Sequence, residues 1–143
     1  MIANILVVED SPSDARLVRE AFRELDSEAE LHLVEDGEQA LDFVLRRGKF
    51  ESALRPDLVL LDLNLPRKSG TEVLQELKNH RLLRGIPVIV LTSSNAREDV
   101  SLAYHYHANG YVTKPSGLEE FFAAIRNIYL FWLHTAELPT RIR

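Results

Sequence analysis

Apolar residues follow two alternating patterns along the chain: short continuous runs, and longer stretches with helical spacing. The runs at 58–61 and 86–91 contain no charged residue and no polar alternation, which is typical of strands buried on both faces of a sheet. Shorter apolar stretches at 2–8, 31–34 and 109–112 have the length of further strands. The pattern therefore predicts five strands.

Between these strands, apolar residues recur every three or four positions, as in helices with one buried face. The predicted inward stripes are Leu17, Val18, Ala21, Phe22 and Leu25, then Ala40, Leu41, Val44 and Leu45, then Val73, Leu74 and Leu77. Helix starts are predicted at Ser11-Pro12, at Ser69-Gly70, at Asn95 with Glu98 for a helix running to about His107, and at Ser116 with Glu119 as a capping box. Such alternation predicts an α/β fold with a parallel sheet covered by helices on both faces.

Polar residues that can carry chemistry come where the predicted strands end. Glu9 and Asp10 follow the first strand, and Asp62 follows the third. Thr92 ends the fourth strand, and Lys114 follows the fifth. Because the carboxyl ends of parallel strands lie along one edge of the sheet, where open α/β folds bind ligands, we expect these five residues to form one pocket.

The residue types at this edge indicate phosphoryl transfer. Three neighbouring carboxylates repel one another unless a cation offsets them, and oxygen donors without Cys favour Mg²⁺. The Lys114 ammonium and the Thr92 hydroxyl can stabilise the oxygens of a phosphoryl group. Asp62 is therefore predicted to be a nucleophile that accepts a phosphoryl group. Since the chain has no Walker-type or dinucleotide glycine motif, the phosphoryl donor must already be activated.

Composition narrows the remaining classes of function. A length of 143 residues fits one domain, and 22 acidic against 17 basic residues give a formal charge of −5, which argues against broad binding to nucleic acid or anionic membranes. The absence of Cys excludes disulfides and thiolate chemistry. No stretch has the length of a membrane span and the amino terminus lacks a basic leader region, so a cytoplasmic protein is expected.

Four motifs in order carry a family resemblance: Val-Val-Glu-Asp at 7–10, Leu-Leu-Asp-Leu-Asn-Leu-Pro at 60–66, Val-Leu-Thr-Ser-Ser at 90–94 and Tyr-Val-Thr-Lys-Pro at 111–115. Together they closely resemble the receiver domains of two-component response regulators, and the likeness extends over residues 4–129. The resemblance implies a flavodoxin-like (βα)5 fold, with a doubly wound five-stranded parallel sheet in the order 2-1-3-4-5.

The resemblance also assigns roles to the strand-end residues. It implies that Asp62 is the phosphoacceptor and that a sensor histidine kinase is the donor. Mg²⁺ would be bound by Glu9, Asp10, Asp62 and the backbone carbonyl of Asn64. These roles agree with the chemistry predicted from the residues themselves.

Three further residues match the parts of the family that respond to phosphorylation. Lys114 would contact the phosphoryl group, and the Lys114–Pro115 peptide bond is expected to be cis. Thr92 and Tyr111 match the switch pair, in which the hydroxyl moves toward the phosphoryl group and the ring turns inward. Because a phosphoryl group adds roughly −1.5 to −2 charges, we expect it to alter the surface of the fourth helix, fifth strand and fifth helix.

The segment at 121–133 is apolar on nearly all sides, which exceeds what a helix packed on one face of a sheet needs. It is too short to span a membrane, and an exposed apolar patch usually marks an interface unless the tail itself covers it. We expect a homodimer through the fourth helix, fifth strand, last helix and carboxyl-terminal extension. The predicted interface residues are Tyr104, Phe121, Phe122, Ile125, Tyr129 and Trp132.

The predicted domain organisation is a receiver domain at 1–130 and a helix extension with a tail at 131–143, without an output domain. The segment at 131–139 and the long connector at 48–56 resemble single-domain regulators paired with cyanobacterial and bacterial phytochromes. This likeness makes a phytochrome the expected kinase partner.

Other functions are compatible with parts of the pattern. A phosphorylation-independent binding module could use the same fold and the apolar helix, although it would not need Asp62 or Lys114. A phosphatase or mutase can also form an aspartyl phosphate, but such enzymes generally place a second acid two residues after the nucleophile, where this chain has Asn64. A flavodoxin-type FMN carrier is compatible with the fold alone.

Overall fold

A sheet of five parallel strands forms the centre of the computed structural model, which describes residues 2–139. The strands are β1 (Asn4–Val8), β2 (Glu30–Val34), β3 (Leu58–Leu61), β4 (Val88–Thr92) and β5 (Gly110–Thr113). They pair in parallel in the order β2-β1-β3-β4-β5, which confirms the predicted order. In this register Val8 pairs with Leu61, and Thr92 pairs with Thr113, so the ends that carry the polar residues are aligned.

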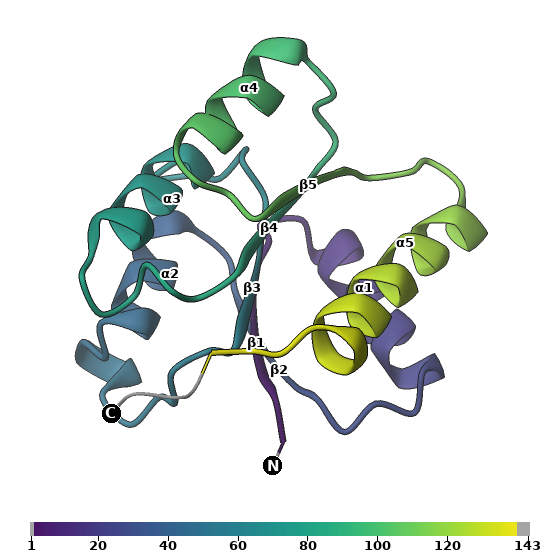
Figure 1. Cartoon of the computed structure of the whole chain (residues 1–143), viewed down its shortest axis with the longest axis horizontal. Coiled ribbons are helices and arrows are strands. Elements are labelled where there is room, and N and C mark those ends of the chain that lie inside the picture. Colours follow the sequence, from purple (N-terminus) through teal and green to yellow (C-terminus); the bar gives the residue numbers. More distant parts are fainter. Residues whose placement is uncertain (1, 140–143) are drawn as a thin grey trace.

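Helices cover both faces of the sheet (Figure 1). One face carries α1 (Pro12–Glu24) and α5 (Leu118–Leu130), and the other carries α2 (Gly37–Val44), α3 (Gly70–Asn79) and α4 (Arg97–His105). Two short helical turns, η1 (Gly48–Phe50) and η2 (Phe131–Thr135), follow α2 and α5. Within residues 2–139, no helix combines the length and the apolar character that crossing a bilayer requires.

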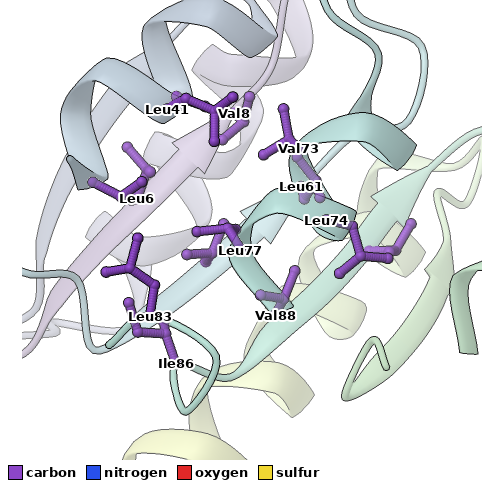
Figure 2. Packing of buried hydrophobic residues seen from close by; sticks show 14 of the residues in the cluster. Leu6, Val8, Leu41, Leu61, Val73, Leu74, Leu77, Leu83, Ile86 and Val88 are labelled. Carbon is purple, nitrogen blue, oxygen red and sulfur yellow. The ribbon is translucent and has the colours of Figure 1, made fainter. Parts of the chain in front are cut away.

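Successive strand residues point to opposite faces, which explains why the strands are apolar without alternation. Ile5 and Val7 pack with α1 and α5, whereas Leu6 and Val8 pack with α2 and α3 (Figure 2). All four side chains are buried. Because each strand contributes to two separate apolar clusters, the sheet is held between two helical layers. The residues that come directly after the strands are polar and lie outside these clusters.

The predicted starts of two helices are confirmed by their caps. The Ser11 hydroxyl accepts the backbone N–H of Asp14 at 3.3 Å, with Pro12 as the first helical residue of α1. Ser69 and Glu72 form a reciprocal capping box at the start of α3. These caps depend on neighbouring residues only, which is why the sequence pattern predicts them.

The start and end predicted for α4 were wrong. The helix begins at Arg97 after Ala96, without a side-chain cap, and it ends at His105. The backbone N–H of Ala96 donates to the Ser94 hydroxyl at 3.3 Å, and the cap expected from Asn95 does not form.

The capping box predicted at the start of α5 does not form. The helix begins at Leu118 after Gly117, whose carbonyl accepts the backbone N–H of Phe121 at 2.9 Å. The Glu120 carboxylate lies against Gly117, in the space that a Cβ atom would fill. The first turn therefore closes one residue later than a cap at Ser116 would place it.

The last helix buries part of the surface that the sequence assigned to a dimer. Phe121 and Ile125 are 3% and 0% exposed because they pack in the core with α1, so their assignment to the interface was wrong. Tyr104 is 50% exposed. Tyr129 is half-buried and packs edge-on against Phe22, with 5.9 Å between ring centroids. The homodimer remains a prediction, with Phe122 and Trp132 half-buried.

Candidate functional site

Asp62 lies directly after β3 with its side chain buried and every carboxylate oxygen in contact with a donor. Its backbone N–H donates to the carbonyl of Val8 at 3.1 Å, which fixes the end of β3 against β1. Oδ1 accepts the Thr92 hydroxyl at 2.8 Å and the backbone N–H of Asn64 at 3.1 Å. Oδ2 lies 3.1 Å from Nζ of Lys114. Three strand ends therefore meet on one carboxylate.

Lys114 connects three carboxylates through its single ammonium group. Nζ lies 2.5 Å from Oε1 of Glu9, 2.8 Å from Oδ2 of Asp14 and 3.1 Å from Oδ2 of Asp62. The backbone N–H of Lys114 donates to the carbonyl of Thr92 at 2.7 Å, so the pairing of β4 with β5 orients this side chain toward the carboxylates. Because an ammonium has three hydrogens, the three contacts use its full donor capacity.

Burial and the shared ammonium act in opposite directions on the protonation of the carboxylates. Burial works against the charged forms, but hydrogen bonds from Thr92 and from the backbone of Asn64, with the charge of Lys114, hold the pKa of Asp62 below its usual value. Burial raises the pKa of Glu9 to about 7, despite the hydrogen bond from Lys114. Although burial disfavours its charge, Asp14 and Glu9 keep the pKa of Lys114 above its usual value. Asp62 is thus the ionised carboxylate and Lys114 the permanent cation.

Glu9, Asp10 and Asp62 can together hold a divalent cation. One oxygen from each lies within 4.8 Å of the others, and Asp10 is exposed while its two neighbours are buried. An all-oxygen set that faces solvent on one side fits a hard ion that keeps some of its water, and Mg²⁺ as that ion remains a prediction. The carbonyl of Asn64 as a further ligand remains a prediction.

Close backbone approach shapes the loop between β3 and α3. The backbone N–H of Gly70 donates to the carbonyl of Leu63 at 2.9 Å, which folds the start of α3 back over the end of β3. A Cβ atom at Gly70 would overlap the carbonyl oxygen of Asp62. Only glycine therefore lets α3 begin this close to the phosphoacceptor candidate.

Thr92 and Tyr111 take up positions compatible with the predicted switch pair. Thr92 is fully buried with its hydroxyl on Asp62, and the Tyr111 ring packs against the core cluster beneath α4. The Tyr111 hydroxyl donates to the carbonyl of Ser94 at 2.8 Å, and the Ser94 hydroxyl donates to Asp99 of α4 at 2.5 Å. Sequence reasoning missed the link to Asp99, because nothing in the local pattern indicates it.

The expected cis bond between Lys114 and Pro115 is absent: every peptide bond within residues 2–139 is trans. A bond before proline favours trans by only about 0.5–1 kcal/mol, so the surrounding contacts decide its isomer. With this bond trans, the Lys114 side chain still reaches all three carboxylates.

Asp14 is the functional-site residue that the sequence analysis failed to identify. The sequence indicates it only as an acidic residue in the first turn of α1, where acids stabilise helices. The structure places its carboxylate on Lys114, outside the group of three that can hold a metal. Its one usable signal was position, since α1 starts at the same edge of the sheet as the other site residues.

The arrangement provides what transfer of a phosphoryl group to Asp62 requires. One carboxylate is ionised, a fixed ammonium lies beside its Oδ2, and a hydroxyl donor lies on its Oδ1. A neighbouring acidic set is able to bind a divalent cation. Positioning and charge stabilisation of this kind account for most catalysis of phosphoryl transfer.

Comparisons with known proteins agree with this geometry. The family model described as "Response regulator receiver domain" matches residues 5–126. The response regulator Rcp1 of Synechocystis sp. is 45% identical over 135 residues, which cover 94% of this chain and 92% of Rcp1.

Two solved structures of regulators are also similar. Phosphorylated RcpA, a cyanobacterial phytochrome response regulator, has a TM-score of 0.95 and 41% identity, covering 98% of this chain and 100% of RcpA. The Mn²⁺-bound form of Rcp1 has a TM-score of 0.92 and 44% identity, covering 96% of this chain and 99% of that one. With the match to the family model and the identity to Rcp1, these likenesses establish that the chain belongs to the response regulator receiver domain family.

Proposed function

We propose that the protein is a single-domain response regulator that accepts a phosphoryl group on Asp62 from a sensor histidine kinase, in a Mg²⁺-dependent reaction. The observation that carries this proposal is the pairing on Asp62, with Lys114 beside Oδ2 and the Thr92 hydroxyl on Oδ1. A pure binding module would not need a buried carboxylate with this set of partners, because such a site is costly to desolvate.

In the proposed reaction, a carboxylate oxygen of Asp62 attacks the phosphorus of a phosphohistidine. The new P–O bond forms as the P–N bond breaks, and the imidazole leaves with the electron pair and takes up a proton. Lys114 stabilises the negative charge on the transferred oxygens, and the Thr92 hydroxyl donates to one of them. Mg²⁺, when held by Glu9, Asp10 and Asp62, would neutralise further charge.

The proposed output is a change on the surface of α4, β5 and α5. A phosphoryl group places roughly −1.5 to −2 charges where one carboxylate stood, so Lys114 and Thr92 interact differently with the two states. The chain from Thr92 through the β4–α4 loop to Tyr111 and Asp99 leads from the site to this surface. We propose that Thr92 and Tyr111 act as the switch pair along it.

A phytochrome is the kinase class that we propose as the donor. This proposal is supported by the likeness to RcpA, which is described as a cyanobacterial phytochrome response regulator, and by the likeness to a response regulator in red light signalling of R. palustris, at 36% identity and a TM-score of 0.90.

Phosphotransfer to wild type and to Asp62→Asn tests the proposed function. We expect wild type to gain one acid-stable, base-labile phosphate from a phosphorylated kinase or from acetyl phosphate, and to lose this ability when EDTA removes Mg²⁺. Asp62→Asn should gain none. Asp42→Asn, the same carboxyl-to-amide change on α2 remote from the site, should behave as wild type. Phosphate on Asp62→Asn would contradict the assignment.

A further inference from the structure

Asp14 reaches the functional site from the first turn of α1. Ser11 caps this helix by accepting the backbone N–H of Asp14 at 3.3 Å, and Pro12 is the first helical residue. In this local frame Oδ2 of Asp14 lies 2.8 Å from Nζ of Lys114, although the two residues are 100 positions apart in the chain. The contact therefore joins the start of α1 to the segment that follows β5.

The three carboxylates around Lys114 differ in exposure and in the other contacts open to them. The side chains of Glu9 and Asp62 are 4% and 7% exposed, and both belong to the group that can hold a divalent cation. The side chain of Asp14 is 33% exposed and lies outside that group. A cation held by Glu9 and Asp62 repels the ammonium and offsets the negative charge that attracts it there. Asp14 is thus the carboxylate that remains with Lys114 alone.

Phosphorylation of Asp62 would change a second of these contacts. The new P–O bond takes one carboxylate oxygen, and the negative charge then lies mainly on the phosphoryl oxygens. One hydrogen of the Lys114 ammonium therefore has to leave Oδ2 of Asp62 for a phosphoryl oxygen. Because the ammonium has three hydrogens, its position during this exchange depends on the contacts that persist. The contact with Asp14 persists, since its oxygen is taken neither by the cation nor by the phosphoryl group.

We propose that Asp14 is a positioning residue for phosphoryl transfer, whose carboxylate holds the Lys114 ammonium in place while a cation and the phosphoryl group occupy the oxygens of Glu9 and Asp62. This inference rests on the proposed phosphorylation of Asp62. A charged group lowers the barrier most when it is already in position as charge develops on the transferred oxygens. Asp14 acts on the reaction through Lys114.

An acidic residue in the first turn of a helix also has an ordinary role, which is to stabilise the positive end of the helix dipole. That role needs no contact with another side chain, and Glu38 can fill it in the first turn of α2. Glu38 forms no ion pair with a residue that the structure describes. It therefore offers a matched control for the loss of one first-turn charge.

The rate of phosphorylation by acetyl phosphate at saturating Mg²⁺ tests the positioning role. In this reaction Asp62 takes the phosphoryl group and acetate leaves. Asp14→Asn keeps the size of the side chain and the backbone N–H that Ser11 accepts, but removes the charge that holds Lys114. We expect the rate to fall by at least about tenfold, because a displaced group loses much of its effect on the transition state. Asp14→Glu, which keeps a carboxylate, should recover most of the rate, and Glu38→Gln should react as wild type does.

The ammonium of Lys114 can also be observed directly by NMR in protein whose lysines carry ¹⁵N. Its Nζ resonance is identified by its absence from Lys114→Arg. With three bonded hydrogens and a side chain that is 8% exposed, this ammonium should exchange slowly with water in wild type. Addition of Mg²⁺ and beryllofluoride, which mimics a phosphoryl group on a carboxylate, should leave the resonance sharp in wild type and in Glu38→Gln. In Asp14→Asn it should broaden through faster exchange.

The two measurements separate the positioning role from the proposed function. If wild type gains no phosphate, the proposed function fails and the positioning role fails with it. If wild type is phosphorylated and Asp14→Asn reacts at the same rate, or keeps the sharp Lys114 resonance with Mg²⁺ and beryllofluoride, the positioning role alone is overturned. It is also overturned if Glu38→Gln slows the reaction as much as Asp14→Asn does, because the effect then comes from the loss of a first-turn charge and not from the contact with Lys114.

Discussion

At the carboxyl-terminal end of the sheet, three carboxylates share one buried ammonium, whereas near the amino-terminal end four arginines and four acidic residues form no ion pair among residues 2–139. Lys114 is held by Glu9, Asp14 and Asp62 at 2.5–3.1 Å. The residues without an ion pair are Arg46, Arg55, Arg81 and Arg84, and Glu24, Asp26, Glu28 and Glu30. The chain therefore has ion-paired charges at one end of the sheet and charges without an ion pair at the other.

The difference follows from burial. A charge removed from water must be compensated within the chain, because an isolated buried ion costs several kcal/mol. A charge at the surface is stabilised by water and can remain available for another molecule. Substitutions at the first end should therefore change the free energy of unfolding much more than substitutions at the second.

The largest expected effect comes from Lys114→Met. Removal of the ammonium leaves Glu9, Asp14 and Asp62 without their shared cation, so the free energy of unfolding should fall by about 3–5 kcal/mol without metal at neutral pH. Urea unfolding measures this change. Added Mg²⁺ should return part of the loss, because a cation again offsets the carboxylates. A loss below about 1 kcal/mol would mean that the cluster is solvated and that the contrast between the two ends is wrong.

The pH dependence of stability should come next in size. The pKa of Glu9 is raised from 4.5 to about 7 in the folded protein, so between these values the folded state binds a proton that the unfolded chain has lost. Stability of the metal-free protein should therefore be greatest below this window and fall by about 2–3 kcal/mol as pH rises through it.

Glu9→Gln is the control for this pH dependence. It should flatten the decline, because the amide does not titrate, and unfolding curves recorded between pH 4.5 and pH 7 compare the two proteins. Mg²⁺ should stabilise wild type more at the upper end of the window, since the ion binds ionised carboxylates. A wild-type profile that stays flat would show that Glu9 is already ionised throughout.

Thr92→Val should have a smaller effect on stability. The substitution keeps the shape of the side chain but removes the hydroxyl that donates to Asp62 at 2.8 Å, at a cost of about 1–2 kcal/mol. The rate of phosphorylation by acetyl phosphate should also fall, because a donor to the transferred oxygens is lost. Thr92→Ser, which keeps the hydroxyl, should restore most of that rate. Equal rates for the Val and Ser variants would remove Thr92 from the proposed mechanism.

The smallest effect is expected from Arg84→Ala at the amino-terminal end. The free energy of unfolding of the monomer should change by less than about 0.5 kcal/mol, because this guanidinium has no ion-pair partner among the described residues. Urea unfolding at a concentration where the protein is monomeric measures this. A loss comparable to that of Lys114→Met would show that both ends use their charges to hold the fold.

Most of the architecture could be predicted from periodicity. The continuous apolar run of β3 gives the strand its position, and Ser69 with Glu72 gives α3 its start, because both signals are local. The start of α5 could not be found in this way. There the Glu120 carboxylate lies against Gly117, and the helix begins one residue after the position that a cap at Ser116 would give. The sequence does not indicate which of these neighbouring residues caps the helix.

The sequence was sufficient to predict that Glu9, Asp10, Asp62, Thr92 and Lys114 lie together, because they follow or end parallel strands that all finish at the same edge of the sheet. Asp14 was missed, since a helix-capping acid and a Lys114 partner look alike in sequence. Phe121 and Ile125 were misassigned, because a helix that is apolar all round does not indicate which side meets the sheet.

The sequence by itself determined the order of strands and helices along the chain and which polar residues follow each strand, since both depend on residue type and spacing. The tertiary structure decided which carboxylates share Lys114 and which face of α5 is buried. These features join residues far apart in the chain, and their distances are fixed only when the sheet and its two helical layers pack together.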